Sequence, residues 1–221
     1  MFVSELQNAL DQYHLLKHPF YISWNEGKLN REIIKDYAEQ YYQHVKAFPR
    51  YISATHSLCE DIKKRKILLE NLQDEENADA DHPRLWKNFA VAIGADKDKI
   101  ENIELEWFTK DMIENFFIHA RSSYAEGLAS LYTYERQIPE IAETKIRGLK
   151  KFYGVNTKEG LEFFEAHKKA DVIHRVECEK LLDSLDNEDK NKAKQAATLT
   201  SRYLWNFLSG MTSKHKLQPA A

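Results

Sequence analysis

The sequence contains one amphipathic segment in which metal-ligand side chains occupy positions that normally hold apolar ones. Its inward positions recur at spacings of three and four residues, and they are Phe164, His167, Asp171, His174, Cys178 and Leu181. Residues at this spacing share one face of a helix, and the flanking apolar residues indicate that this face is turned toward a protein core. A buried carboxylate without a partner would be strongly destabilising. The sequence therefore predicts a helix over residues 157–184 with a metal site on its inner face.

The spacing of the two histidines favours two metal ions over one. His167 and His174 would lie about 10.5 Å apart along the helix axis, because each helical residue advances by about 1.5 Å. Metal bonds to nitrogen and oxygen are about 2.0–2.2 Å long, so a single ion cannot easily accept both imidazoles. Two ions about 3.5–4 Å apart could accept one imidazole each, with Asp171 between them. We therefore expect a dinuclear site.

Two further expected helices also place a carboxylate on an apolar face. In segment 122–137 that face consists of Tyr124, Leu128, Leu131, Glu135 and Ile138. In segment 62–78 it consists of Leu68, Leu72 and Glu75. His82 lies directly before Pro83, and proline disfavours helical geometry in the residue that precedes it. We therefore expect the chain to break between Glu75 and His82, which would let both side chains reach one centre.

Six candidate metal ligands result from these patterns: Glu75, His82, Glu135, His167, Asp171 and His174. Carboxylate oxygens and imidazole nitrogens are the ligands of non-haem iron or manganese, and such a centre needs no thiolate. Helical-bundle dimetal proteins also place Glu and His on facing helices, although the Glu-x-x-His pair of the ferritin-like class is absent here.

The composition predicts an all-α protein. Seven Gly and five Pro among 221 residues, with no convincing strand alternation, favour helices joined by short turns. The expected helices are 2–17, 30–48, 50–60, 62–78, 83–94, 106–120, 122–137, 139–153, 157–184 and 188–213. The expected breaks lie at or near Pro19, Pro49, Pro83 and Pro139. We see no internal repeat or linker, so we expect a single helical bundle domain over 1–213 and a flexible tail over 214–221.

The charge pattern and the cysteine content argue against several classes of protein. The 32 Lys and Arg and 35 Asp and Glu give a net charge of −3, without the basic face that nucleic-acid binding requires. The sequence has no signal-like amino terminus and no apolar run of about 20 residues, so we expect a cytoplasmic protein that does not enter a membrane. Cys59 and Cys178 form no Cys-x-x-Cys motif, which argues against a zinc finger or a redox pair.

Five motifs resemble one known family. They are Lys46-Ala-Phe-Pro, Leu72-Gln-Asp-Glu-Glu-Asn, Leu131-Tyr-Thr-Tyr-Glu-Arg-Gln-Ile-Pro, Lys145-Ile-Arg-Gly-Leu and Glu165-Ala-His-Lys-Lys-Ala-Asp-Val-Ile-His. Together they are similar to the chlamydial death-domain-associating protein family, a branch of the haem-oxygenase-like diiron proteins related to pyrroloquinoline quinone synthase C. The similarity extends over nearly all of the chain up to about residue 210. It implies a haem-oxygenase-like helical bundle that is usually a homodimer, with metal ligands at the same six positions.

The resemblance also implies a reaction. Members of the family are associated with making para-aminobenzoate for folate biosynthesis, by an oxygen-dependent route in which the protein's own tyrosine supplies the ring and a lysine supplies the nitrogen. By motif these residues would be Tyr21 and Lys145. The implied cofactors are two metal ions, Fe/Fe or Fe/Mn, with dioxygen as co-substrate and an external reductant. The residues themselves support the lysine, because an amine on the apolar face of helix 139–153 could be desolvated and nucleophilic.

Ordinary structural roles remain open for most of these residues. His167, Asp171 and His174 could form a structural network with Arg121 or Arg147. Glu75 could be a solvated member of an acidic run, and His82 could simply cap the next helix. Lys145 could extend its amine to solvent.

Three other functions also remain open. The chain could be an oxidase that acts on a separate small aromatic molecule, as the pyrroloquinoline quinone synthase relatives do. It could be a thiaminase-like enzyme, although neither cysteine has an evident activating neighbour. It could instead be a non-catalytic protein that binds death domains. The last reading, and any secretion into a host cell, rests on family analogy alone.

Overall fold

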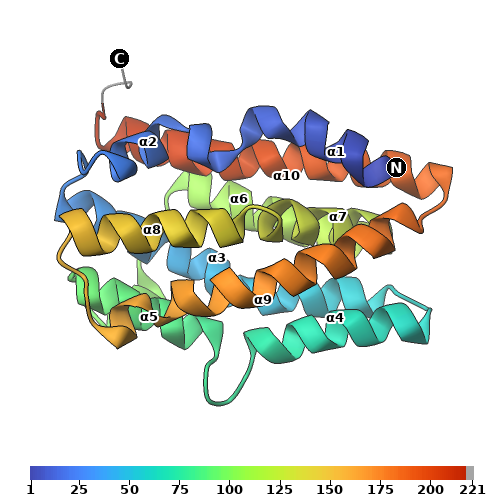
Figure 1. Cartoon of the computed structure of the whole chain (residues 1–221), viewed down its shortest axis with the longest axis horizontal. Helices are drawn as coiled ribbons and strands as arrows, with labels where there is room; N and C mark the ends of the chain where they lie inside the picture. Colours follow the sequence, from blue (N-terminus) through green and yellow to red (C-terminus); the bar gives the residue numbers. More distant parts are fainter. Residues whose placement is uncertain (218–221) are drawn as a thin grey trace.

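The computed structural model describes residues 1–217, apart from the side chains of 169–173. Its α-helices, drawn in Figure 1, are α1 Phe2–Leu10, α2 Pro19–Asn25, α3 Arg31–Ser57, α4 Ile62–Glu75, α5 His82–Ile93, α6 Trp107–Ser122, α7 Tyr124–Glu135, α8 Ile138–Phe152, α9 Lys158–Asp183 and α10 Asn187–Lys214. Short 3-10 helices lie at η1 Asp11–Tyr13, η2 Leu15–Lys17 and η3 Ile100–Asn102. The described residues contain no strand, which confirms the all-α prediction. None of the described helices is long and apolar enough to cross a membrane.

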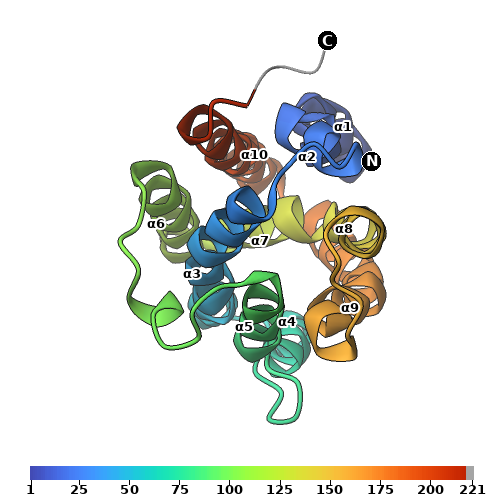
Figure 2. The ribbon, with the colours of Figure 1, turned by 90° about the vertical axis from the view of Figure 1, so that its left-hand side faces the viewer.

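Helix α7 is the innermost element of the bundle. Every residue from Gly127 to Glu135 is buried, although only one face of a helix at the surface of a bundle is normally covered. Figure 2 shows α7 near the middle, with α3, α6, α8, α9 and α10 around it. The last residue of α7 therefore lies in the interior, and that residue is Glu135.

The expected break at Pro49 is wrong, because α3 continues through it from Arg31 to Ser57. A proline inside a helix removes one backbone hydrogen bond and costs about 3 kcal/mol. The apolar face of α3 continues on both sides of Pro49, with Phe48, Tyr51 and Ile52 fully packed in the core. Burial of that continuous face offsets the local cost.

The expected helix over 2–17 is also wrong in its second half. Helix α1 ends at Leu10, two 3-10 turns follow, and the short helix α2 begins at Pro19. His18 caps α2, because its ring nitrogen accepts a hydrogen bond from the backbone N–H of Phe20. This local cap and the proline start a new helix that was not among the expected segments.

Helices α2 and α8 approach each other closely at Gly148. A Cβ atom at Gly148 would overlap with Nε1 of Trp24 on α2. The hydroxyl of Tyr153 holds the same region by donating to the Trp24 carbonyl at 2.9 Å. Tyr21 and Lys145 each lie one turn away on these two helices, so the contact sets their relative position.

Gly148→Ala should therefore destabilise the protein, although alanine favours helices over glycine by about 1 kcal/mol. The steric conflict with Trp24 should exceed that gain and give a net loss of about 1–2 kcal/mol in the free energy of unfolding. Urea unfolding of Gly148→Ala beside Lys151→Ala, an exposed position next to the same helix end, measures the effect. A stabilised Gly148→Ala protein would show that the contact is not tight.

Candidate metal centre

Three candidate ligands from three helices meet in the interior. Glu75 ends α4, His82 begins α5 and His167 lies in the middle of α9. One ligand atom of each lies within 4.8 Å of the other two. Oε2 of Glu75 is 2.8 Å from Nδ1 of His82, and Oε1 is 4.0 Å from Nε2 of His167. The three side chains are at most 4% exposed, so the cluster is enclosed by protein.

The break between α4 and α5 brings Glu75 and His82 together, as the sequence predicted. The turn after α4 ends at Asp81, whose carboxylate caps α5 by accepting from the backbone N–H of Arg84. His82 is therefore not the cap of this helix. Glu75 is 3% exposed and is not a solvated member of an acidic run.

His167 is oriented for metal binding by its own helix. Its Nδ1 lies 2.8 Å from the backbone carbonyl of Phe163. A carbonyl can only accept, so Nδ1 carries the proton and Nε2 is left as the ligand atom. Burial, and then the neighbouring His82, lowers the pKa of His167 well below its usual value. The neutral imidazole that results is the form that binds metals.

Glu135 projects from the end of the buried helix α7. Asn71 of α4 donates its amide Nδ2–H to Oε1 of Glu135 at 2.6 Å, and the Cys178 thiol donates to Oε2 at 3.6 Å. Burial, followed by the charge of Glu135, raises the pKa of Cys178 well above its ordinary value. Cys178 is therefore a protonated thiol and a poor nucleophile.

His174 is paired with a carboxylate that the sequence analysis did not select. Its Nε2 lies 3.0 Å from Oδ2 of Asp74, the residue before Glu75 on α4. Asp171 belongs to α9, but its side chain lies outside the described residues. The sixfold ligand set therefore remains a prediction, of which Glu75, His82 and His167 form a cluster with metal-binding geometry.

The arginine alternative finds no support in the described side chains. The guanidinium carbon of Arg121 lies 4.4 Å from the centre of the Phe117 ring. Arg147 is exposed and donates to Oγ1 of Thr144 at 3.3 Å. The donor set around Glu75 consists instead of hard oxygen and imidazole nitrogen, which fits an iron or manganese ion.

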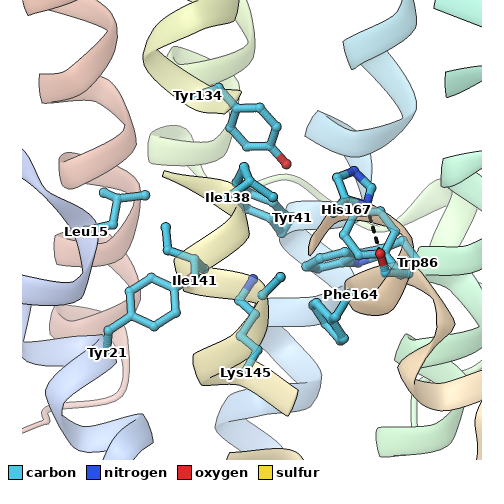
Figure 3. A pocket seen from close by; sticks show the side chains of 12 residues that line it. Leu15, Tyr21, Tyr41, Trp86, Tyr134, Ile138, Ile141, Lys145, Phe164 and His167 are labelled. Carbon is cyan, nitrogen blue, oxygen red and sulfur yellow. Dashed lines mark hydrogen bonds between the residues drawn. The ribbon is translucent and has the colours of Figure 1, made fainter. Parts of the chain in front are cut away.

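A narrow internal pocket extends from His167 toward α2 and α8. Figure 3 shows Tyr21, Lys145 and His167 on its wall, with the phenol of Tyr134 above them. The remaining wall is mainly apolar and aromatic, including Trp86. Its free space is about 10 Å³, which is close to the volume that one water molecule needs.

Lys145 and Tyr21 are connected inside this region through Tyr37. The Lys145 Nζ donates to the Tyr37 hydroxyl at 2.7 Å, and that hydroxyl lies 3.2 Å from the hydroxyl of Tyr21. Lys145 is 4% exposed, so its amine does not extend to solvent. Burial lowers the pKa of Lys145 to about 7 and raises that of Tyr21 well above its usual value. The site thus holds a neutral phenol and an amine that is partly unprotonated near neutral pH.

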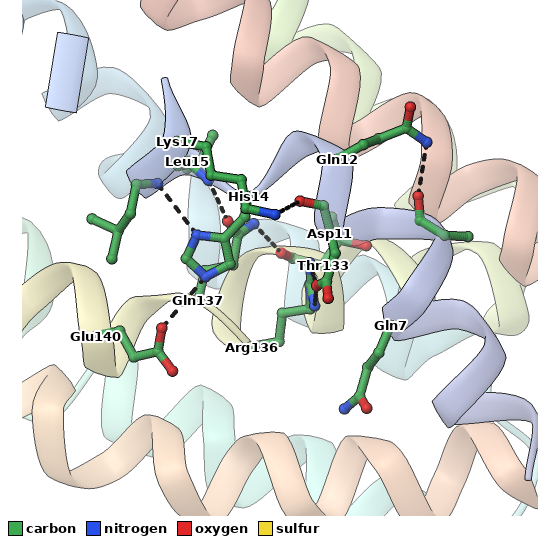
Figure 4. A network of polar contacts seen from close by, with 12 residues as sticks. Gln7, Asp11, Gln12, His14, Leu15, Lys17, Thr133, Arg136, Gln137 and Glu140 are labelled. Carbon is green, nitrogen blue, oxygen red and sulfur yellow. Dashed lines mark hydrogen bonds and ion pairs between the residues drawn. The ribbon is translucent and has the colours of Figure 1, made fainter. Parts of the chain in front are cut away.

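The segment between α1 and α2 covers one side of the pocket and is fixed by polar contacts with the α7–α8 junction (Figure 4). Oε1 of Gln137 accepts from the backbone N–H of Leu15 at 2.8 Å, and Leu15 lines the pocket. Arg136 pairs with Asp11 at 3.3 Å, and His14 lies 3.4 Å from Glu140. This network holds the start of α2, and hence Tyr21, against α8.

Sequence reasoning missed Asn71, Asp74 and Tyr37. The buried residues of α4 are Leu68, Asn71 and Glu75, whereas Leu72 is only half-buried. Both Asn71 and Leu72 have helical spacing to Glu75, so the sequence favoured the apolar residue. The inner face therefore includes Asn71 in the place assigned to Leu72. Tyr37 is one of several buried tyrosines of α3 and has no distinguishing neighbour in sequence. Asp74 contacts a partner 100 residues away.

A family model described as TENA/THI-4/PQQC family matches residues 3–214. The chain belongs to this family. A 4-aminobenzoate synthase from Chlamydia muridarum is 39% identical over 220 residues, which cover 99% of this chain and 91% of the relative. A 4-aminobenzoate synthase from Nitrosomonas europaea is also 39% identical, over 222 residues that cover 95% of this chain and 90% of the relative. A pyrroloquinoline-quinone synthase from Acinetobacter baumannii is 25% identical, covering 91% and 82%.

Solved structures confirm the expected haem-oxygenase-like fold of this family member. A domain from Shewanella denitrificans described as having a heme oxygenase-like fold superposes with a TM-score of 0.81 at 16% identity, covering 97% of this chain and 91% of that one. A CADD-like protein of unknown function from Nostoc punctiforme superposes with a TM-score of 0.80 at 12% identity, and the match covers 96% of both chains. At these identities the likeness concerns the fold alone.

The buried amine should make stability depend on pH. The pKa of Lys145 is about 7 in the folded protein against an ordinary 10.5, so in this interval the unfolded chain holds more protons and stability rises with pH. Relative to Lys145→Met, the wild-type free energy of unfolding should rise by up to about 1.4 kcal/mol per pH unit between about pH 7 and 9. Urea unfolding across this range measures it. Lys150→Met, at an exposed position, should follow the wild type, and a Lys145→Met curve parallel to the wild type would contradict the assignment.

Proposed function

We propose that this chain is an oxygen-dependent enzyme that makes 4-aminobenzoate, with its own Tyr21 as the source of the ring and Lys145 as the source of the nitrogen. The observation that carries the proposal is the hydrogen-bonded path from Lys145 Nζ through the Tyr37 hydroxyl to the Tyr21 hydroxyl. Four curated relatives that are 39–40% identical over nearly the whole chain carry the name 4-aminobenzoate synthase, which supports the product.

The arrangement matches the difference between a tyrosine side chain and the product. 4-Aminobenzoate has an amine where tyrosine has its hydroxyl, and a carboxylate where tyrosine has its methylene. The Lys145 Nζ lies 5.6 Å from the centre of the Tyr21 ring. The Tyr37 hydroxyl connects this amine to the Tyr21 hydroxyl by two hydrogen bonds. The nitrogen donor is therefore close to the end of the ring that must receive nitrogen.

The oxidative part of the reaction is assigned to a dimetal centre. Two metal ions, iron with iron or iron with manganese, would supply the reduction of dioxygen with electrons from an external reductant. The residues proposed to hold them are Glu75, His82, Glu135, His167, Asp171 and His174. The cluster of Glu75, His82 and His167 supports this centre, and His167 also lines the pocket that Tyr21 and Lys145 share.

The protein's own groups prepare the two reacting side chains. Burial keeps a share of Lys145 in the neutral form, whose lone pair can bond to carbon. The Tyr37 hydroxyl accepts from Lys145 and can donate to Tyr21, so it can carry a proton between them. The aromatic wall leaves space for about one water molecule and so protects reactive species from solvent.

The size of the pocket favours an internal substrate over a separate one. A free volume of about 10 Å³ does not admit another aromatic molecule, as an oxidase with an external substrate would need. Burial also raises the pKa of both thiols, Cys59 and Cys178, which disfavours a thiaminase-like cysteine nucleophile. The homodimer, a death-domain partner and a cytoplasmic location remain predictions from the sequence analysis.

Tyr21→Phe should abolish product formation, because the variant lacks the phenol that the reaction converts. Protein labelled with carbon-13 in its tyrosine rings should yield labelled 4-aminobenzoate in the wild type, at no more than one molecule per chain, as read by mass spectrometry. Tyr203→Phe, at a position for which the structure gives no hydrogen bond, is the matched control and should retain activity.

The metal content of Tyr21→Phe should equal that of the wild type, since Tyr21 is not among the proposed ligands. Undiminished 4-aminobenzoate from Tyr21→Phe would show that Tyr21 is not the source of the ring. Unlabelled 4-aminobenzoate from labelled wild-type protein would show that the ring comes from another molecule. An absence of iron and manganese from active wild-type protein would remove the dimetal centre from the proposal.

A further inference from the structure

Helix α4 contacts the proposed centre through more than its one ligand. Besides Glu75, it contributes Asn71, which donates to Glu135 on α7 at 2.6 Å, and Asp74, which lies 3.0 Å from His174 on α9. Neither Asn71 nor Asp74 belongs to the proposed ligand set. Each contacts a different member of that set, on a different helix.

The inner face of α4 is unusually polar for a packed helix. Its buried residues are Leu68, Asn71 and Glu75, so two of the three are polar. A buried amide is costly unless its hydrogen bonds are made. The short bond to Glu135 satisfies Nδ2 of Asn71, whereas its Oδ1 has no hydrogen-bond partner in the described part of the chain. A leucine would fit the apolar pattern of this face better, which argues for a specific role of the amide.

Asn71 fixes the orientation of the Glu135 carboxylate. The amide Nδ2 is a donor and cannot bind a cation, so at 2.6 Å it holds Oε1 without competing as a ligand. The Cys178 thiol approaches Oε2 from α9 at 3.6 Å. The carboxylate is therefore held from two sides at the end of a buried helix.

Asp74 has the corresponding effect on His174. A carboxylate that accepts the proton of one ring nitrogen fixes the tautomer and directs the other nitrogen to the metal. With Nε2 of His174 paired to Asp74, Nδ1 becomes the ligand atom. The Asp74 side chain is 54% exposed, so this residue can be substituted without disturbing the core.

We propose that Asn71 and Asp74 are positioning residues for one half of the metal centre, the half that Glu135 and His174 serve. The inference rests on the proposed dimetal function. Glu75, His82 and His167 already lie within 4.8 Å of one another and form the other half. The two ions should therefore respond unequally, because removing Asn71 or Asp74 disturbs the ligands of one ion and leaves the cluster of the other in place.

The experiment measures anaerobic binding of Mn²⁺ to the purified full chain, by calorimetry and by electron paramagnetic resonance. Wild-type protein should bind two ions per chain and give the signal of a spin-coupled pair. Asn71→Leu should lower the affinity for the ion that Glu135 and His174 serve by about 10–100-fold. The affinity for the other ion should not change. At intermediate Mn²⁺ concentration, the electron paramagnetic resonance signal of Asn71→Leu should be that of an isolated ion. Asp74→Asn should lower the affinity of the same ion, nearer to tenfold.

Matched controls come from neighbouring exposed positions on and beside α4. Gln73→Leu repeats the polar-to-apolar change, and Glu76→Gln repeats the loss of a carboxylate charge. Both should bind two ions as the wild type does. A weakening by Glu76→Gln equal to that by Asp74→Asn would show a general charge effect and would overturn the role of Asp74.

The remaining outcomes separate this inference from the proposed function. Wild-type affinity in both Asn71→Leu and Asp74→Asn overturns the inference while the dimetal proposal stands. Equal loss of both ions together with a lowered melting temperature assigns a merely structural role to these residues and also overturns it. A wild-type protein that binds no metal under these conditions overturns the proposed function itself, and the inference with it.

Discussion

The burial of ionisable side chains between helices is the constraint on which the rest of this structure depends. Glu75 and Glu135 are at most 3% exposed, and a carboxylate in such surroundings is destabilising without compensation. Helices suit this arrangement because they satisfy their own backbone hydrogen bonds and leave inward side chains available for other partners. In α7, the buried surroundings of the whole helix make the position of Glu135 especially well defined.

Much of the site could be predicted because it follows from local patterns. The three- and four-residue spacing identifies which residues of α9 and α7 face inward, and a charged residue at such a position stands out. Proline disfavours helical geometry in the residue before it, so Pro83 predicts a break that brings His82 to Glu75. The structure contains this break, since α4 ends at Glu75 and α5 begins at His82. Fold class follows from the same patterns, since an amphipathic helical segment can be recognised without information about its partners.

The features that could not be predicted depend on contacts between distant segments. Whether Pro49 ends a helix is decided by how well the two halves of α3 pack, and the packed core keeps them continuous. The inner face of α4 was assigned to Leu72 because an apolar residue is the better guess, yet Asn71 is buried by its bond to a carboxylate 64 residues away. Tyr37 resembles the other tyrosines of α3 until Lys145 of α8 lies beside it.

The half-exposed position of Asp74 bears on how cations could reach an enclosed centre. A hydrated divalent ion sheds its water shell reluctantly, and direct passage into an apolar interior would strip it all at once. A carboxylate at the protein surface, hydrogen-bonded to a buried imidazole, permits a stepwise exchange of water for protein ligands. The pair of Asp74 and His174 thereby links the protein surface to the inner face of α9, the face that also carries His167.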